Sequence, residues 1–331
     1  MPLVSVILTS YNHAKYIKKA IDSVLEQTFD DFELIIWDDA SSDNSWEIIN
    51  SYHDNRIRKF RNEHQMRAIF GINEAISNVA TGEYIAIHHS DDVWAPEKLE
   101  KQVKQFNLHQ DCGAVFTWAQ IIDERGAVMP NHFLNATFSQ PNRTRHDWLN
   151  IMFFGGNFFC HPSALIRKGC FDLVGKYNNG LAQLVDMDMW VRILLQYDVI
   201  VIDEKLTKMR ILDGEKNAGA IRIDSIARDK FESFMILSNY LAINKVQEVM
   251  KIFPFLSATI PNQGEIGDDL ASFLIGLVAV QRGNKPQLHL FGAQILTNTV
   301  KNPQLLEKAN KAIGFNKQYY ADIVGRTQIF C

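Results

Sequence analysis

Two adjacent carboxylates, Asp91 and Asp92, follow closely after a short run of residues typical of a β-strand, Tyr84–His88. Like charges this close repel each other, and a cation or an array of donors can neutralise them. Carboxylates are preferred ligands of Mg²⁺ and Mn²⁺, and such ions commonly bridge a carboxylate to the phosphates of a substrate. The pair therefore predicts a divalent cation and a phosphate-bearing substrate. Capping of the helix that begins near Pro96 is the alternative.

Polar clusters also follow two other predicted strands. The β-branched run Leu3–Thr9 leads into a polar cluster that extends to Asn12, and Glu33–Trp37 leads into Asp38 and Asp39. Between the strands, apolar residues recur at the three- and four-residue spacing of helices with one buried face. Such alternation predicts an α/β fold, a mostly parallel sheet with helices on both faces. Ligands bind beyond the carboxyl ends of such strands, so the three clusters predict one site.

The rest of the chain predicts a second, helical domain. Residues 114–213 show a looser pattern of strands and helices with long loops, as expected on the acceptor side of an enzyme. A linker rich in Gly, Asn and Lys follows at Asp213–Gly219, and the remaining residues are almost wholly helical in pattern. We expect domains at 1–218 and 219–331. For the second we expect a role in packing, homo-oligomerisation or contact with a membrane surface that holds a lipid-linked acceptor.

Composition narrows the class of protein. The chain has 331 residues, of which 47% are hydrophobic and 22% charged, and its net charge of −4 argues against nucleic acid as the main partner. The four cysteines have no spacing typical of metal ligands, which favours reduced thiols. The longest apolar stretches, such as Phe273–Val280, are far shorter than the roughly 20 residues of a membrane span. We therefore expect a cytoplasmic enzyme, with possible peripheral contact at the inner membrane face.

Seven segments, in this order along the chain, resemble the motifs of family 2 glycosyltransferases with the GT-A fold. They are Val4–Asn12, Ile21–Thr28, Phe32–Asp43, Gly82–Trp94, His161–Arg167, Val174–Tyr177 and Asp186–Arg192. The resemblance covers about residues 1–213. It implies a nucleotide-sugar donor, a divalent cation (Mn²⁺ or Mg²⁺) and an inverting transfer to an acceptor hydroxyl in glycan or surface polysaccharide synthesis.

The resemblance also implies roles for individual residues. It places Thr9, Tyr11, Asp39 and Asp91 in the nucleotide-sugar site, Asp92 on the metal and Asp186 as the general base. The position of Asp39 matches an aspartate that accepts from the N–H of the base, which favours a UDP- or dTDP-sugar. Asp91 matches the acid near the ribose.

Several alternatives stay open at this point. Local capping by Asp38 or Ser41 could explain the cluster around Asp39, and Asp186 could be an ordinary acid at a helix N-terminus. At the position of His89 the family often has an aspartate. We favour a structural or supporting role for His88 and His89, with metal ligation as the alternative.

Two other functions compete with glycosyl transfer. A sugar-nucleotide nucleotidyltransferase shares the α/β architecture, but it needs a basic Gly-rich loop after the first strand, and Thr9–His13 is not one. A non-catalytic nucleotide-sugar-binding or scaffold protein is the other, because Val185 stands where many family members have a glutamate.

Overall fold

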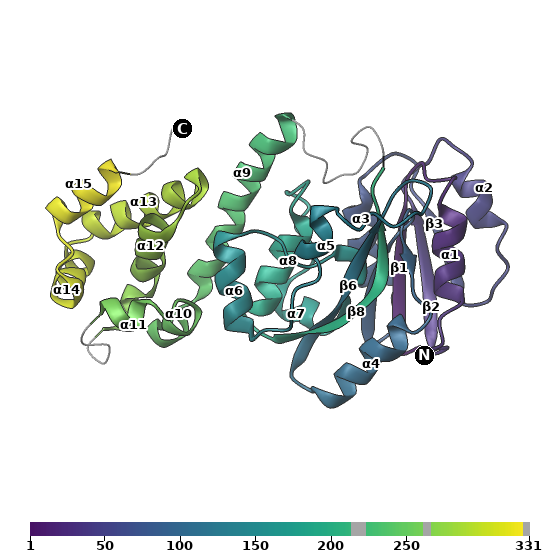
Figure 1. Cartoon of the computed structure of the whole chain (residues 1–331), viewed down its shortest axis with the longest axis horizontal. Helices are drawn as coiled ribbons and strands as arrows, with labels where there is room; N and C mark the ends of the chain where they lie inside the picture. Colours follow the sequence, from purple (N-terminus) through teal and green to yellow (C-terminus); the bar gives the residue numbers. More distant parts are fainter. Residues whose placement is uncertain (213–222, 261–265, 327–331) are drawn as a thin grey trace. The chain divides into compact units, whose positions relative to one another are not determined.

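The computed structural model describes residues 1–212, 223–260 and 266–326 (Figure 1). The chain divides into two compact units, one of residues 1–144 and 158–220 and the other of residues 145–157 and 221–331. The predicted boundary at 218 and 219, like Asp213, lies outside the described residues. The segment 145–157, which the sequence pattern placed in the first domain, belongs to the second unit.

An eight-stranded sheet with the order β3-β2-β1-β4-β7-β6-β8-β5 forms the centre of the first unit. Its strands are β1 (Val4–Ser10), β2 (Phe32–Asp38), β3 (Ile57–Arg61), β4 (Tyr84–His89), β5 (Val93–Trp94), β6 (Cys112–Ile122), β7 (Leu165–Arg167) and β8 (Asp198–Arg210). The first four strands in this order are mutually parallel, as are β6 and β8, whereas β7 and β5 run antiparallel to their neighbours. The predicted mostly parallel α/β sheet is confirmed.

Helices cover both faces of this sheet. They are α1 (Ile17–Leu25), α2 (Ser45–Asn50), α3 (Ala68–Glu74), α4 (Lys98–Leu108), α5 (Phe133–Thr137), α7 (Cys170–Val174) and α8 (Val185–Leu194). Alternate residues of β1, such as Val6 and Leu8, pack in one core with α1, α2 and α4. On the opposite face, Gly71 of α3 lies so close to Trp37 that an added Cβ would be 2.6 Å from the indole Cδ1. Trp190 of α8 packs edge-on against Phe116 of β6.

Two helices have ends with distinctive geometry. Helix α3 continues into a π-helical turn, Ala75–Val79, in which the N–H of Ala80 donates to the carbonyl of Ala75 at 2.7 Å. Helix α8 begins at Val185, so Asp186 lies in its first turn. The helix therefore fixes the backbone of Asp186 itself.

The second unit consists of helices. They are α6 (Arg145–Phe154), α9 (Ile223–Leu237), α10 (Val246–Ile252), α11 (Leu256–Thr259), α12 (Ala271–Arg282), α13 (Pro286–Lys301), α14 (Pro303–Ile313) and α15 (Lys317–Gly325). Phe153 of α6 packs edge-on against Tyr240 and Phe253, with ring centroids 4.9 and 5.0 Å away. Because Gly276 and Gly292 lack side chains, α12 and α13 approach closely, and a Cβ on Gly292 would lie 2.5 Å from the Gly276 carbonyl oxygen.

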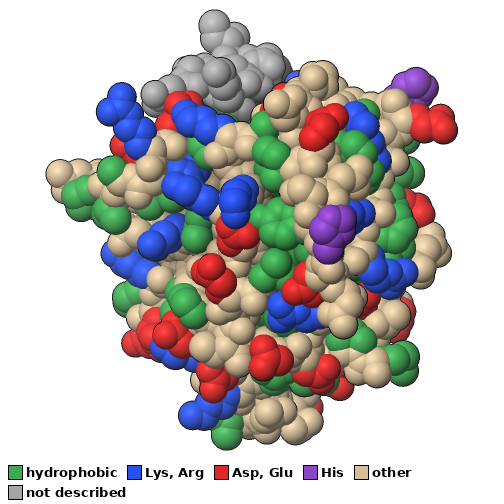
Figure 2. Space-filling view, turned by 90° about the vertical axis from the view of Figure 1, so that its right-hand side faces the viewer, with side chains coloured by type: hydrophobic (Ala, Val, Ile, Leu, Met, Phe, Trp, Pro, Cys, Tyr) green, Lys and Arg blue, Asp and Glu red, His purple; other side chains and the backbone are tan. Residues whose placement is uncertain are grey.

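Charges are mixed on the face of the molecule at the right of Figure 1. Figure 2 shows that Lys and Arg side chains alternate there with Asp and Glu side chains, with small apolar areas between them. Within the described ranges, no helix has the length and apolar character needed to cross a membrane.

Candidate functional site

The three polar clusters lie at the same edge of the sheet. Thr9 of β1 is in register with Trp37 of β2 on one side and with His89 of β4 on the other. Backbone hydrogen bonds continue past the strand ends, from the Asp39 N–H to the Ser10 carbonyl and from the Ser90 N–H to the Thr9 carbonyl. The structure therefore brings the ends of β1, β2 and β4 together, as the sequence predicted.

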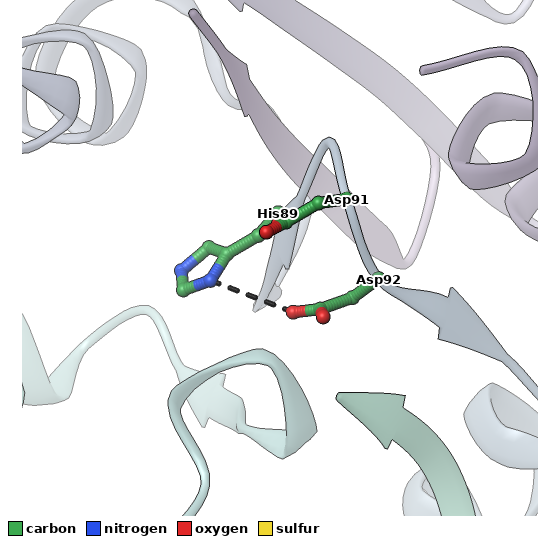
Figure 3. A group of neighbouring side chains, drawn as sticks. All are labelled: His89, Asp91 and Asp92. Carbon is green, nitrogen blue, oxygen red and sulfur yellow. Dashed lines mark ion pairs between the residues drawn. The ribbon is translucent and has the colours of Figure 1, made fainter. Parts of the chain in front are cut away.

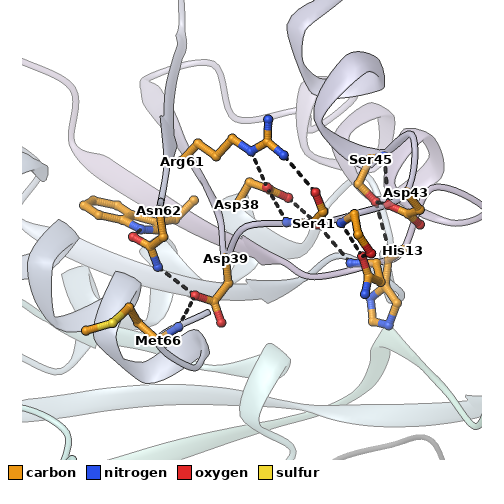
Figure 4. A network of polar contacts seen from close by, with 12 residues as sticks. His13, Asp38, Asp39, Ser41, Asp43, Ser45, Arg61, Asn62 and Met66 are labelled. Carbon is orange, nitrogen blue, oxygen red and sulfur yellow. Dashed lines mark hydrogen bonds and ion pairs between the residues drawn. The ribbon is translucent and has the colours of Figure 1, made fainter. Parts of the chain in front are cut away.

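A hydrogen-bond network joins the loops that follow β1 and β2 (Figure 4). The fully buried carboxylate of Asp38 accepts from the N–H and the hydroxyl of Ser41, at 2.9 and 2.6 Å. Ser41 Oγ accepts from the N–H of Asn12, and Arg61 Nε lies 3.4 Å from Asp38. Asp38 therefore stabilises the loops after β1 and β2. The neighbouring Asp39 has different partners.

Asp39 accepts three hydrogen bonds from the segment between β3 and α3. Its Oδ1 accepts from Asn62 Nδ2 and from the Met66 N–H, both at 2.7 Å, and its Oδ2 accepts from the Arg67 N–H at 2.8 Å (Figure 4). These bonds are not those of a helix cap. Since a carboxylate has about four acceptor sites, one remains on Oδ2. The side chain is thus held in one orientation with room for one further donor.

Arg67 connects this segment to the loop before α8. Its backbone has φ of 72°, which is unusual for a residue with a side chain. Its guanidinium donates to the carbonyl oxygens of Leu181 and Asn179, at 3.1 and 2.7 Å. The segment that orients Asp39 is therefore tied to the loop that leads to Asp186.

The pair Asp91 and Asp92 lies in the turn between β4 and β5 (Figure 3). Asp92 is only 2% exposed, and its Oδ1 accepts from the Arg210 N–H at 2.8 Å. Burial, together with the negative charge of Asp91, raises the pKa of Asp92 well above its usual value. One ligand atom from each of His89, Asp91 and Asp92 lies within 4.8 Å of the others. Two crowded carboxylates and an imidazole are a donor set that fits a divalent cation.

Arg210, at the end of β8, holds this turn and was not predicted from the sequence. It is 2% exposed, and its Nε donates to the Asp91 carbonyl oxygen at 2.8 Å. Its Nη1 donates to the carbonyl oxygens of Asp123 and Glu124, at 2.8 and 3.1 Å. The only signal in the sequence is one basic residue among several on a strand. Its partners, more than eighty residues away along the chain, become evident only in the fold.

Asp186 lies in the first turn of α8. Its Oδ1 accepts from the Met187 N–H at 2.8 Å. Burial raises the pKa of the Cys160 thiol well above its usual value, and the charges of Asp92 and Asp186 add to this effect. The two carboxylates therefore act on one buried sulfur, from different elements. Asp188 forms an ion pair with Arg192 in the same helix, at 2.6 Å.

The remaining predicted residues differ in exposure. Thr9 is 7% exposed at the end of β1, whereas Tyr11 is 39% exposed. His88 is fully buried and packs on the Trp94 ring at 4.3 Å, and burial lowers its pKa well below its usual value. The predicted structural role fits this placement of His88. His89 instead points toward Asp92 and His161.

Residues 5–173, about half of the chain, match the sequence model of Glycosyl transferase family 2. The chain belongs to this family. It is 33% identical over 215 residues to the uncharacterized glycosyltransferase MJ1057 of Methanocaldococcus jannaschii, covering 63% of this chain and 71% of that protein. It is 25% identical over 218 residues to the chondroitin synthase of Escherichia coli, covering 66% of this chain but only 30% of the synthase. It is 37% identical over 137 residues to the putative teichuronic acid biosynthesis glycosyltransferase TuaG of Bacillus subtilis, covering 41% and 53%.

Solved structures share the fold at low sequence identity. Residues 1–349 of S. aureus TarS, in complex with UDP-GlcNAc, match with a TM-score of 0.61 and 16% identity, covering 97% of this chain and 90% of that one. The mannosyltransferase PcManGT of Pyrobaculum calidifontis, in complex with GDP-Man and Mn²⁺, matches with a TM-score of 0.53 and 15% identity, covering 98% and 86%. The chain is thus a family 2 glycosyltransferase with a GT-A-type α/β unit and a helical C-terminal region.

Proposed function

We propose that this enzyme is a metal-dependent, inverting glycosyltransferase that uses a UDP- or dTDP-sugar and glycosylates a hydroxyl group of a glycan or lipid-linked acceptor. The observation that supports this most directly is the placement of Asp39, Asp91 and Asp92 at one sheet edge. The charges of Asp92 and Asp186 also both raise the pKa of the Cys160 thiol. Relatives named for chondroitin and teichuronic acid synthesis support a role in polysaccharide synthesis.

The nucleotide of the donor is assigned to the ends of β1 and β2. Asp39 has one acceptor site left on Oδ2 after its three protein donors, and the N3–H of uracil or thymine supplies one donor. Thr9 lies at the adjacent strand end, and Tyr11 follows it in the next loop. Asp91, in the turn after β4, is assigned to the ribose hydroxyls.

The divalent cation is assigned to Asp92, beside Asp91. Two buried like charges next to each other are unfavourable, and the raised pKa of Asp92 reflects this cost. A cation bound there would supply neutralisation of the charge that develops on the leaving diphosphate. Because Arg210 holds the turn, the two carboxylates keep their positions when no cation is bound.

Asp186 is assigned as the general base. An inverting transfer needs a carboxylate opposite the leaving group, which takes the proton of the acceptor hydroxyl as the anomeric carbon becomes positive. The Met187 N–H fixes one oxygen of Asp186 at the N-terminus of α8, where the helix dipole favours negative charge. The side chain is therefore held at a helix end whose dipole stabilises a negative charge.

Substitution of Asp186 by Asn tests this role. We expect unchanged donor binding and a loss of transfer of about 10²–10⁴-fold, the usual contribution of a general base. Asp172→Asn is the matched control, because Asp172 is also an acid in the first turn of a helix but is exposed. Unchanged transfer in Asp186→Asn would rule out Asp186 as the base, and donor binding without any transfer in the wild type would favour the non-catalytic alternative.

The donor is tested by thermal shift with UDP-, dTDP- and GDP-sugars, each with and without Mn²⁺. A donor that binds the folded state raises the melting temperature in step with its concentration relative to its dissociation constant. The largest shift is expected with a UDP- or dTDP-sugar plus Mn²⁺, and a metal-independent shift with a GDP-sugar would refute both assignments.

The roles expected for the helical unit remain predictions. Self-association is measured by sedimentation velocity of the full chain, and contact with a membrane surface by flotation with anionic vesicles. The flotation assay also tests the peripheral membrane contact that the expected location at the inner membrane face requires.

A further inference from the structure

The two ring nitrogens of His89 face different neighbours. Nδ1 lies 3.6 Å from Asp92 Oδ2, which is longer than a hydrogen bond (Figure 3). Nε2 lies 3.3 Å from Nδ1 of His161, and His161 Nε2 lies 2.9 Å from the hydroxyl of Tyr177. A chain of polar groups that ends at the buried Tyr177 therefore orients the ring, and its other nitrogen faces the carboxylate.

The hydrogen bonds along these polar groups can run in either of two directions, which place the His89 proton on different nitrogens. A neutral imidazole donates from one nitrogen and accepts at the other. If Tyr177 donates to His161 and His161 to His89, the proton of His89 must be on Nδ1, where Asp92 is too distant to accept it. In the opposite direction His89 Nε2–H donates to His161, and each ring nitrogen along the chain has a partner except His89 Nδ1, which carries a lone pair.

In this second direction, the lone pair of His89 Nδ1 faces the position that a cation shared with Asp92 would take. Two ligands bound to one ion at about 2.1 Å, with an angle of about 90–110°, lie about 3–3.4 Å apart. The observed 3.6 Å between His89 Nδ1 and Asp92 Oδ2 differs from this by a few tenths of an ångström. His89 is also accessible, since 35% of its side chain is exposed, whereas Asp92 is almost fully buried.

We propose that this site takes a first-row transition-metal ion in preference to Mg²⁺, bound through the His89 nitrogen and the Asp92 carboxylate. Imidazole suits later first-row ions, whereas all-oxygen sites suit Mg²⁺. His161 and Tyr177 are positioning residues, because the partner of the second ring nitrogen fixes the tautomer and orientation of a ligating histidine. The inference rests on the cation site of the proposed function and concerns which ion that site selects.

Mn²⁺ is the probe of the nitrogen ligand. Electron spin echo spectra are recorded of the full chain with Mn²⁺ alone and with Mn²⁺ and UDP. We expect imidazole ¹⁴N modulation in the wild type, and in His89→Gln its loss together with at least about tenfold weaker Mn²⁺ binding. His53→Gln, a change at an exposed histidine, should alter neither. Bound Mn²⁺ without a nitrogen ligand in both samples would overturn the inference and leave the proposed cation role of Asp92 intact.

Competition tests the selectivity directly. Zn²⁺ and Mg²⁺ are titrated against bound Mn²⁺, and the signal of released Mn²⁺ is recorded. In the wild type, Zn²⁺ should displace Mn²⁺ at a far lower concentration than Mg²⁺ does. His89→Asp makes an all-oxygen site, and it should reduce the ratio of these two concentrations at least tenfold. An unchanged difference would overturn the inference.

The positioning role has its own readout. His161→Phe should keep the nitrogen modulation but weaken Mn²⁺ binding by about 10–100-fold. Unchanged binding would remove the positioning role. Transfer that is indifferent to chelator, with the nitrogen still on Mn²⁺, would refute the metal role in the proposed function while leaving this site.

Discussion

Replacement of Arg210 by Met tests how the Asp91–Asp92 turn is held. Met keeps most of the apolar volume but removes three side-chain hydrogen bonds to carbonyl oxygens, made at 2.8–3.1 Å. Hydrogen bonds to charged groups contribute about 1.5–3 kcal/mol each, so these three would sum to about 4.5–9 kcal/mol if each were lost in full. The freed carbonyls can bind water and Asp92 can take up a proton, which lowers the cost. We expect a loss of about 3–5 kcal/mol, as for removal of one partner of a buried charge pair.

Urea unfolding followed by tryptophan fluorescence measures this loss. Of the 6 tryptophans of the chain, Trp148 alone belongs to the second unit, so the signal reports mainly on the unit that contains Arg210. Arg125→Met, at an exposed arginine in a nearby loop, is the control and should change stability by less than about 0.5 kcal/mol. A loss below about 1 kcal/mol in Arg210→Met, or an equal loss in the control, would refute the assignment.

Three further predictions concern other parts of the chain. Gly82→Ala should destabilise the protein by about 1–3 kcal/mol in urea unfolding, because its Cβ would lie 2.6 Å from the backbone nitrogen of Ser5; a neutral change would contradict the close packing of β1 and β4. Arg67→Met should weaken donor binding in calorimetry, because the segment that orients Asp39 loses its two bonds to the loop before α8, and unchanged affinity would remove this role. Hydrogen bonds from Lys251 and His146, with the charge of Arg145, lower the pKa of Glu248 from 4.5 to about 2. The contribution of Glu248 to stability is therefore complete above about pH 4.5 and is lost as the pH falls toward 2. Denaturation of Glu248→Gln and wild type across this range should show a stability difference that shrinks on acidification, and a constant difference would exclude the effect.

The sequence predicted the part of the site that depends on strand order. An apolar run followed by polar residues marks a strand end, and parallel pairing places such ends together, so Thr9, Asp39 and Asp91 could be grouped without coordinates. Local composition could not separate Asp38 from Asp39. Their difference arises from partners such as Ser41 and Met66, which the turn places on opposite sides.

The contacts that the sequence did not predict are distant along the chain. Arg210 reaches Asp91 across 119 residues, and His89 reaches His161 across 72. A single basic or aromatic residue in a strand or loop has many possible partners, and only the packed sheet selects one. The same holds for α6, whose apolar pattern suits either unit until Phe153 is placed against Tyr240 and Phe253.

The position of α6 determines whether the two units can be separated by truncation or exchanged by recombination. Because the helical unit takes residues 145–157 from within the catalytic unit, the polypeptide passes between the two units more than once. No single cut can therefore separate them. Truncation near residue 218 would remove Tyr240 and Phe253, the aromatic partners of Phe153 in α6, and expose this ring, which is buried in the intact chain. Recombination that exchanged only the C-terminal helices would meet the same obstacle, so the two units are expected to be inherited together.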